Sequence, residues 1–144
     1  MSLVVYTHGS CINERRSKAS SGIGVFFGPN DARNVSERIL GPIQTTTRAE
    51  LEAIRKAIIN LGVIDQTSTR PVIIIGTYSQ KAIDSLVGFQ DPESLNYGII
   101  QDIRNRVYES GYFVKLQRIP ISYSNKHIEA AQLLAMSAAR RKLY

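Results

Sequence analysis

Residues 35–61, VSERILGPIQTTTRAELEAIRKAIINL, change from the two-residue period of a strand to the 3.6-residue period of a helix. Residues 35–40 alternate apolar and polar side chains, which predicts a strand with one solvated face. Residues 47–61 carry apolar side chains at helical offsets, which predicts an amphipathic helix. These side chains are Leu51, Ile54, Ile58 and Leu61. The threonines before the helix offer N-cap hydroxyls, and Gly62 suits its C-terminal cap.

Two further strands are expected upstream, at residues 3–6 and 22–27, because both runs are apolar and both end at a glycine. The three predicted strands lie close enough in the sequence to form an antiparallel meander. Between the first two, residues 13–21 are polar and predict a turn that carries basic side chains.

Downstream of the helix, strands and helices alternate. Residues 72–75 are a continuous apolar run, which is typical of a strand buried on both faces. Helices are expected at 79–87, 95–108 and 125–142, and a further strand at 113–119. A meander followed by strand–helix–strand crossovers predicts an α/β fold, with one five-stranded mixed sheet, strands four and five parallel, and helices on both faces.

The length of 144 residues fits one domain spanning residues 1–144. The 18 Lys and Arg exceed the 12 Asp and Glu, and the net charge of +6 favours polyanionic partners such as nucleic acid. The single cysteine, Cys11, excludes an internal disulfide framework. No apolar run approaches the ~18 residues of a membrane span, and no leader peptide is recognised before Leu3. We therefore expect a cytoplasmic or nuclear protein with no membrane partner.

Six segments resemble motifs of the type 1 ribonuclease H family, in the same order and at near-identical spacing. They are 5–11 (VYTHGSC), 22–29 (GIGVFFGP), 35–38 (VSER), 44–51 (QTTTRAEL), 75–79 (IGTYS), and 119–120 with 127–135 (IP and HIEAAQLLA). The family counterparts of the first, fourth and fifth segments are Y-T-D-G-S, T-N-Q-R-A-E-L and T-D-S. The resemblance covers nearly the whole chain and implies a ribonuclease H-like fold, in agreement with the order of elements above.

The same resemblance implies a nuclease that cleaves RNA/DNA hybrids with two magnesium ions held by four carboxylates. The corresponding positions here are His8, Glu50, Tyr78 and Gln132, so only Glu50 is a carboxylate. The family's loop histidine falls at Ser122. Imidazole and phenol are poor magnesium ligands, and an amide offers only a neutral oxygen. We therefore expect no catalytic residues, no metal site and no bound magnesium, with Tyr78 packed over the vacated site.

The family's hybrid-binding positions are changed as well. Its phosphate pocket and 2′-hydroxyl readers fall at residues 43–47, where this chain has Ile43 in place of an arginine and neither amide reader. Its basic, tryptophan-bearing protrusion is replaced by residues 88–93, which are acidic and lack Trp. The remaining candidates for nucleic-acid contact are hydroxyls and cations: Thr45, Thr46, Thr47, Arg15, Arg16, Lys18, Arg140, Arg141 and Lys142. For the cations, ordinary solvated surface is the alternative interpretation.

Three functions remain open. The first is a catalytically inactive pseudo-nuclease domain that serves as a scaffold for an unidentified protein partner, because the catalytic and hybrid-binding positions are changed together. The second is non-catalytic binding of RNA, DNA or RNA/DNA hybrid, motivated by the net charge and the threonines. The third is a residual metal-dependent hybrid nuclease that uses Glu50. Self-association through aromatic side chains at 97–113 is a further interpretation, and their packing in the core is its alternative.

Overall fold

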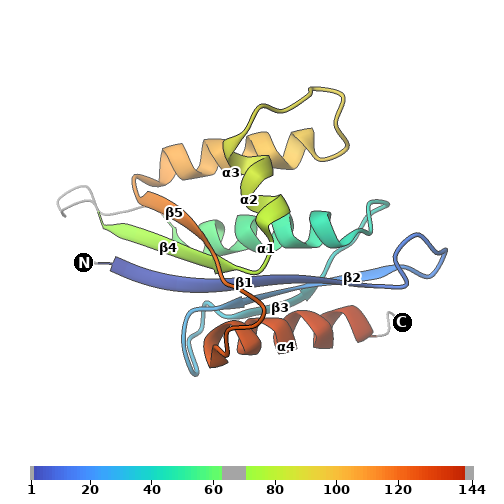
Figure 1. The fold of residues 1–144 in the computed structure, drawn as a ribbon, viewed down its shortest axis with the longest axis horizontal. Coiled ribbons are helices and arrows are strands. Elements are labelled where there is room, and N and C mark those ends of the chain that lie inside the picture. Colours follow the sequence, from blue (N-terminus) through green and yellow to red (C-terminus); the bar gives the residue numbers. More distant parts are fainter. Residues whose placement is uncertain (1, 63–70, 142–144) are drawn as a thin grey trace.

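The computed structural model describes residues 2–62 and 71–141, which form a five-stranded sheet with helices on both faces (Figure 1). The elements in chain order are β1 (Ser2–Ile12), β2 (Ser20–Phe26), β3 (Val35–Arg38), α1 (Thr46–Leu61), β4 (Val72–Thr77), α2 (Gln80–Val87), α3 (Tyr97–Ser110), β5 (Phe113–Arg118) and α4 (Lys126–Arg140). This order of strands and helices is the one predicted from the sequence.

The sheet has the strand order β3-β2-β1-β4-β5. β1, β2 and β3 form an antiparallel meander, whereas β4 pairs parallel with both β1 and β5. α4 packs against β1, β2 and β3 on one face; α1 packs against β1 and β2 on the other, with α3 against its outer side (Figure 1). The predicted α/β fold with one mixed sheet is confirmed.

β1 runs to Ile12, whereas the sequence predicted an end near Tyr6. Its second half stays in the sheet because residues 6–12 pair in register with β2. Gly9, which resembled a strand end, is required by packing instead: a Cβ there would lie 2.2 Å from the backbone carbon of Ala49 in α1. The other boundaries differ from the predicted ones by two residues or fewer.

The prediction that β4 is buried on both faces is wrong for one face. Ile73 and Ile75 are buried on the side of α1, whereas Val72 is 37% exposed and Ile74 is half-buried. The reason is the position of α4, which packs under β1, β2 and β3 and leaves this face of β4 only partly covered.

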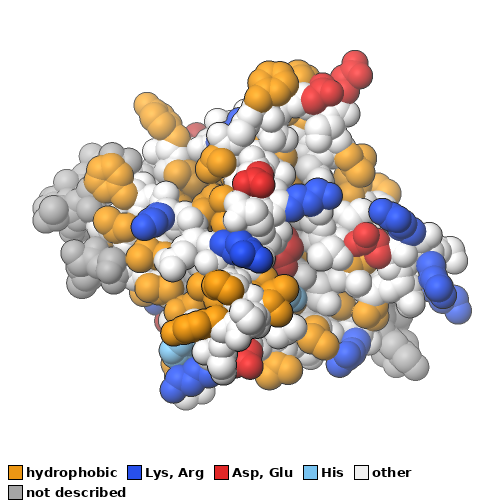
Figure 2. All heavy atoms as spheres, viewed as in Figure 1, with side chains coloured by type: hydrophobic (Ala, Val, Ile, Leu, Met, Phe, Trp, Pro, Cys, Tyr) orange, Lys and Arg blue, Asp and Glu red, His pale blue; other side chains and the backbone are white. Residues whose placement is uncertain are grey.

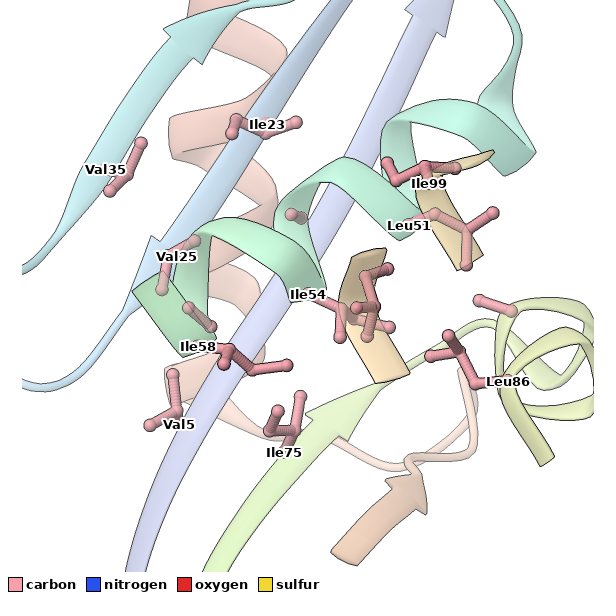
Figure 3. Close-up of a cluster of buried hydrophobic side chains, with 14 of the residues drawn as sticks. Val5, Ile23, Val25, Val35, Leu51, Ile54, Ile58, Ile75, Leu86 and Ile99 are labelled. Carbon is pink, nitrogen blue, oxygen red and sulfur yellow. The ribbon is translucent and has the colours of Figure 1, made fainter. Parts of the chain in front are cut away.

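The two faces of the sheet are packed in different ways. A buried aliphatic cluster fills the space between the sheet and helices α1, α2 and α3, with Leu51, Ile54 and Ile75 among its fully buried members (Figure 3). On the other face, α4 lies so close to β2 that a Cβ on Gly24 would be 2.0 Å from the carbonyl oxygen of Ala131. Close packing on both faces therefore fixes α1 and α4 relative to β1.

None of the helices in the described ranges is long and apolar enough to cross a membrane. Of the aromatic side chains considered for self-association, Tyr112 packs against the core, whereas Tyr108 is 86% exposed on α3.

Candidate functional site

The four positions singled out in the sequence meet at one open cleft of about 590 Å³. His8 comes from β1, Glu50 from α1, Tyr78 from the end of β4 and Gln132 from α4. The parallel pairing of β1 with β4 brings His8 on β1 next to Tyr78, which directly follows β4, and α1 and α4 reach the cleft from opposite faces of the sheet. The fold therefore brings together four residues that lie far apart in the sequence.

Glu50 is fixed against the backbone of β1. Because Gly9 lacks a Cβ, the first turns of α1 lie directly on the strand. The Gly9 N–H donates to Glu50 Oε1, and the Thr77 hydroxyl donates to Glu50 Oε2 over 3.0 Å. Both carboxyl oxygens are thus engaged by the protein itself, and Glu50 is only 3% exposed.

Burial raises the pKa of Glu50 from 4.5 to about 7, although its two hydrogen bonds act in the opposite direction. Near neutral pH a large share of the molecules therefore holds this carboxyl uncharged. A metal ligand must be deprotonated, so a buried, protonated carboxyl is a weaker site for a hard cation than an exposed carboxylate.

His8 lies beside Glu50 without forming an ion pair near neutral pH. Its Nδ1 is 3.5 Å from Glu50 Oε1, and its side chain is 15% exposed. Burial lowers the pKa of His8 from 6.5 to about 4, so the imidazole is neutral over the range in which Glu50 ionises. Within the described ranges, the buried Nδ1 has no hydrogen-bond partner. Burial therefore favours the neutral form of both side chains, the imidazole of His8 and the carboxyl of Glu50.

Tyr78 stands edge-on against His8, with ring centroids 5.8 Å apart and an interplanar angle of 86°. Burial and the nearby charge of Glu129 raise the pKa of the Tyr78 hydroxyl. Tyr78 lines the cleft beside His8, where the sequence predicted that it packs over the vacated site, and the cleft stays open next to it. From the loop before α4, Ile121 lines the cleft, whereas Ser122 is exposed and is not among the residues that line it.

The cleft offers few hard anionic ligands. Among the described residues that line it, only Glu50 and Glu129 are acids, and Glu129 is exposed on α4. In the part of the chain that the structure describes, no three His, Cys, Asp or Glu side chains are grouped so as to hold a metal ion. Magnesium prefers several oxygen ligands in octahedral geometry. The imidazole, phenol and amide at the other three positions do not fit that preference.

Thr45, which precedes α1, and Thr46, its first residue, stabilise the start of the helix. Thr45 Oγ1 caps α1 by accepting the Arg48 N–H at 3.1 Å. The Glu14 carboxylate accepts both the N–H and the hydroxyl of Thr46, while Thr47 is half-buried. The cap was predicted from the sequence, but the role of Glu14 was not. Two of the three candidate hydroxyls therefore already have partners within the protein.

The two basic clusters of the sequence lie at the same end of the molecule. Arg15, Arg16 and Lys18 are exposed on the turn between β1 and β2. The strand that follows this turn begins against the end of α4, because the hydroxyl of Ser20, the first residue of β2, donates to the carbonyl oxygen of Ala139 over 2.6 Å. The side chains of the turn and of the last helical turn therefore contribute to one surface.

β3 connects the two clusters. Arg141 Nη2 donates to Ser36 Oγ at 2.7 Å, and Arg38 Nη1 donates to the carbonyl oxygen of Arg141 at 2.7 Å. Arg140 is exposed, and the candidate Lys142 lies outside the described residues. In Figure 2, Lys and Arg side chains gather at the right of the molecule, where Figure 1 shows the β1–β2 turn and the end of α4. Arg38 was not among the predicted contacts but belongs to this surface.

Two residues that position Glu50 were not predicted from the sequence: Gly9, which lines the cleft, and Thr77, which is buried behind it. The Gly9 N–H and the Thr77 hydroxyl hold Glu50 in place. Thr77 immediately precedes Tyr78 at the end of an apolar run, which is the only sequence feature that points to it. Gly9 resembled a turn residue, so its contact with α1 became evident only from the packing.

Comparisons with known proteins agree with this architecture. The model of the RNase H family matches residues 1–134. Ribonuclease H1 of Homo sapiens is 46% identical over 119 residues, which cover 81% of this chain and 39% of that protein. Ribonuclease H of Schizosaccharomyces pombe is 47% identical over 57 residues, which cover 40% of this chain and 22% of that protein. The chain thus spans well under half the length of these curated relatives.

Solved structures share the fold. LC11-RNase H1, isolated from compost, superimposes with a TM-score of 0.74 at 19% identity, over 96% of this chain and 95% of that chain. LC11-RNase H1 in complex with an RNA/DNA hybrid gives a TM-score of 0.74 at 20% identity, over 95% and 96% of the two chains. The foamy viral protease-reverse transcriptase in complex with dsDNA gives 0.71 at 19% identity, over 96% and 94%. These matches confirm the ribonuclease H-like fold expected from the sequence motifs.

Proposed function

The chain belongs to the ribonuclease H family, and on that premise we propose that it is a member that no longer cleaves RNA/DNA hybrids and serves as a protein-interaction domain. The cleft carries the proposal. Of the four positions at which the resemblance implies a metal-binding carboxylate, only Glu50 has one. The other three residues, His8, Tyr78 and Gln132, occupy the same cleft but offer ligands that do not suit magnesium.

Glu50 is itself poorly available to a cation. Each oxygen of Glu50 already accepts one hydrogen bond, from the Gly9 N–H or the Thr77 hydroxyl, and near neutral pH a metal ion would have to displace a proton from much of the population. Two divalent ions close together would repel each other strongly in a cleft with so little negative charge. The family's magnesium is therefore not part of the proposed function.

The proposed protein interaction rests on two observations: the buried core is retained, and aliphatic side chains are exposed near the start of α1. The buried cluster is complete on the side of α1, although the catalytic and hybrid-binding positions are changed. Near the start of α1, where the resemblance places a phosphate pocket, Leu40 is 75% exposed and Ile43 is half-buried. Exposed aliphatic side chains suit a protein surface better than a phosphate.

A cleavage assay tests the loss of catalysis. Purified protein is incubated in excess over a labelled RNA/DNA hybrid with Mg²⁺ or Mn²⁺, alongside Glu50→Gln prepared in the same way. We expect no cleavage above the level of the variant, which accounts for contaminating nucleases. Cleavage by the unmodified protein that disappears in Glu50→Gln would contradict the proposal and would favour the residual nuclease instead.

Nucleic-acid binding without cleavage is the second candidate function. It is favoured by the joining of the two basic clusters at one end of the molecule. LC11-RNase H1 was solved with an RNA/DNA hybrid and the foamy viral protein with dsDNA, so a nucleic-acid partner is compatible with this fold. The dependence of binding on salt and on nucleic-acid type tests this candidate.

A further inference from the structure

A second groove lies beside the cleft, between the β1–β2 turn and the loop that joins β3 to α1. It has an open volume of about 830 Å³. Its aliphatic part includes Leu40 and Ile43 from the loop and Leu95 from the segment before α3. Leu40 is 75% exposed and Leu95 is 66% exposed. Two large aliphatic side chains are therefore presented to solvent at one groove, which we call the loop groove.

The charge along the loop groove has one sign. Arg15, Arg16 and Arg38 line it, and the described residues of its lining include no Asp or Glu. Arg38 Nη1 is bonded to a backbone carbonyl rather than to a carboxylate. The nearest acid in the turn, Glu14, bonds to Thr46. The groove thus combines an aliphatic floor with guanidinium groups that form no ion pair with a carboxylate among the described residues, although the charge of Arg15 acts on Glu14 and lowers its pKa.

The loop groove is held in shape by Gln44. Its Oε1 accepts the Ser21 N–H at 2.8 Å, and its Nε2 donates to the carbonyl oxygens of Ile39 and Gly41 at 3.1 and 2.9 Å. The loop is therefore tied to β2 before any partner arrives. A surface that is already ordered loses less conformational entropy when it binds.

We propose that the loop groove binds an acidic peptide segment of a partner protein, with aliphatic side chains as its anchors. This inference rests on the proposed function and names the class of partner. Carboxylates of the peptide pair with Arg15, Arg16 and Arg38, while its leucine or isoleucine side chains cover Leu40 and Leu95. The volume of about 830 Å³ lies within the range of roughly 300–1,000 Å³ that is typical of ligand-binding clefts.

Nucleic acid fits the same groove less well. Single-stranded bases bind by stacking on aromatic rings, and no aromatic side chain is among the described residues that line the loop groove. A sugar–phosphate backbone would satisfy the arginines but would leave Leu40 and Leu95 against a polar ligand. An acidic, aliphatic peptide satisfies both parts of the surface.

Selection of peptides from a random displayed library on the purified chain tests the inference. We expect the enriched peptides to carry Asp or Glu next to spaced aliphatic residues. Their binding to the Leu40→Ser/Leu95→Ser variant and to the Arg15→Glu/Arg16→Glu variant should weaken by at least about tenfold. Thermal unfolding of each variant shows whether the fold is retained.

Control variants carry substitutions of the same kind, a leucine replaced by serine and two basic side chains replaced by glutamate, at exposed positions away from the loop groove. Leu133→Ser on α4 removes a leucine that is 68% exposed, and Lys115→Glu with Arg118→Glu reverses two exposed charges on β5. We expect both controls to bind the selected peptides as the unmodified protein does. Equal losses in the groove variants and in the controls would overturn the assignment of the groove.

The remaining outcomes separate this inference from the proposed function. Peptides without the acidic–aliphatic pattern, or peptides that bind both groove variants normally, overturn the loop groove but leave a protein-interaction domain standing. No enrichment at all contradicts both. An RNA/DNA hybrid that displaces the peptides, and that itself fails to bind Leu40→Ser/Leu95→Ser, would make the groove a nucleic-acid site. Hybrid cleavage, measured separately, contradicts only the proposed loss of catalysis.

Discussion

At the scale of single residues, the centre of the cleft holds a carboxyl and an imidazole that are both favoured in their neutral forms. The buried Glu50 keeps its proton to about pH 7, and the buried His8 releases its proton near pH 4. These shifts have opposite consequences for stability. The neutral form of Glu50 stabilises the fold below its unfolded pKa, and this contribution is lost as the pH rises toward 7. The contribution of neutral His8 is present above pH 6.5 and is lost as the pH falls toward 4.

Substitution of Glu50 or His8 should remove that residue's contribution to the pH dependence of stability and leave the opposite contribution of the other residue. We expect Glu50→Gln to gain stability relative to the unmodified protein as the pH rises from about 4 to about 8, by about 3 kcal/mol, because the amide that replaces the carboxyl has no proton to lose. The stability of His8→Gln should fall less than that of the unmodified protein as the pH is lowered toward 4, because the substituted side chain takes up no proton. Urea unfolding across this pH range measures both slopes, and a Glu50→Gln curve parallel to that of the unmodified protein would contradict the raised pKa.

Three substitutions should restore the chemistry that the resemblance implies. We expect the combined variant His8→Asp, Tyr78→Asp and Gln132→Asp to cleave RNA/DNA hybrid in Mg²⁺ at least about 100-fold faster than the unmodified protein, because four carboxylates then share one cleft. Each single substitution should remain inactive, since one added carboxylate does not balance two divalent ions. Gel analysis of labelled hybrid measures the cleavage; equal rates for the unmodified protein and the combined variant would contradict the account.

At the scale of elements, the position of α4 depends on two glycines of β2, Gly22 and Gly24, which have no side chain on the face that α4 covers. A Cβ on Gly24 would lie 2.0 Å from the Ala131 carbonyl oxygen and 2.7 Å from the Ala135 nitrogen. Gly22, one turn of α4 further along, faces the Ala135 carbonyl oxygen in the same way. The helix that supplies Gln132 to the cleft therefore keeps its place through contact of backbone with backbone.

Gly24→Ala should for this reason destabilise the protein by about 3 kcal/mol, as expected when a well-packed contact is overfilled. The control is Gly28→Ala, because nothing lies within 4 Å of a Cβ at Gly28 and its φ is not positive. Urea midpoints of the two variants measure the difference. Similar urea midpoints for both variants would show that α4 can move away from β2 without loss of stability, which would contradict the close packing of Gly24 against Ala131.

Sequence patterns predicted the elements well where one face of each is apolar and the ends are marked. The cap of α1 at Thr45 and the crossover from β4 to β5 followed from such patterns. The patterns failed where a long-range contact decides the outcome. Gly9 resembled a strand end because nothing nearby in the sequence shows that α1 will lie on it. The exposed face of β4 likewise depends on how far α4 extends across the sheet, which an apolar run does not reveal.

At the scale of the whole molecule, the net charge of +6 is unevenly distributed. Several other arginines are paired with acids, including Arg33 with Asp31 and both Arg55 and Arg106 with Asp102. The arginines of the β1–β2 turn have no such partner among the described residues. The sequence showed two separate basic clusters, and only the pairing of distant strands placed them on one surface.

This distribution of charge predicts electrostatic binding of nucleic acid that does not discriminate between hybrid, duplex and single strand. Hybrid, duplex and single-stranded oligonucleotides should bind with similar affinity at low salt, because Thr46 and Thr47 stand where the resemblance implies amide readers and the Gln44 amide is bonded within the protein. Arg15→Glu/Arg16→Glu should flatten the dependence on salt by about 0.9 in logarithmic slope for each lost phosphate contact. Fluorescence anisotropy measures both effects, with Lys115→Glu/Arg118→Glu as the control. A hybrid preference that survives at high salt would contradict this prediction.

Metal binding at Glu50 decides whether the cleft holds the family's metal ions, and we propose that it holds none. The measurement is a titration of the isotope-labelled chain with paramagnetic Mn²⁺, followed through the amide spectrum. We predict no selective, saturable broadening of the amides of Gly9, Glu50 and Gln132, because the only carboxylate of the four positions is buried and already bonded. Saturable broadening centred on these amides, which disappears in Glu50→Gln, would contradict the claim.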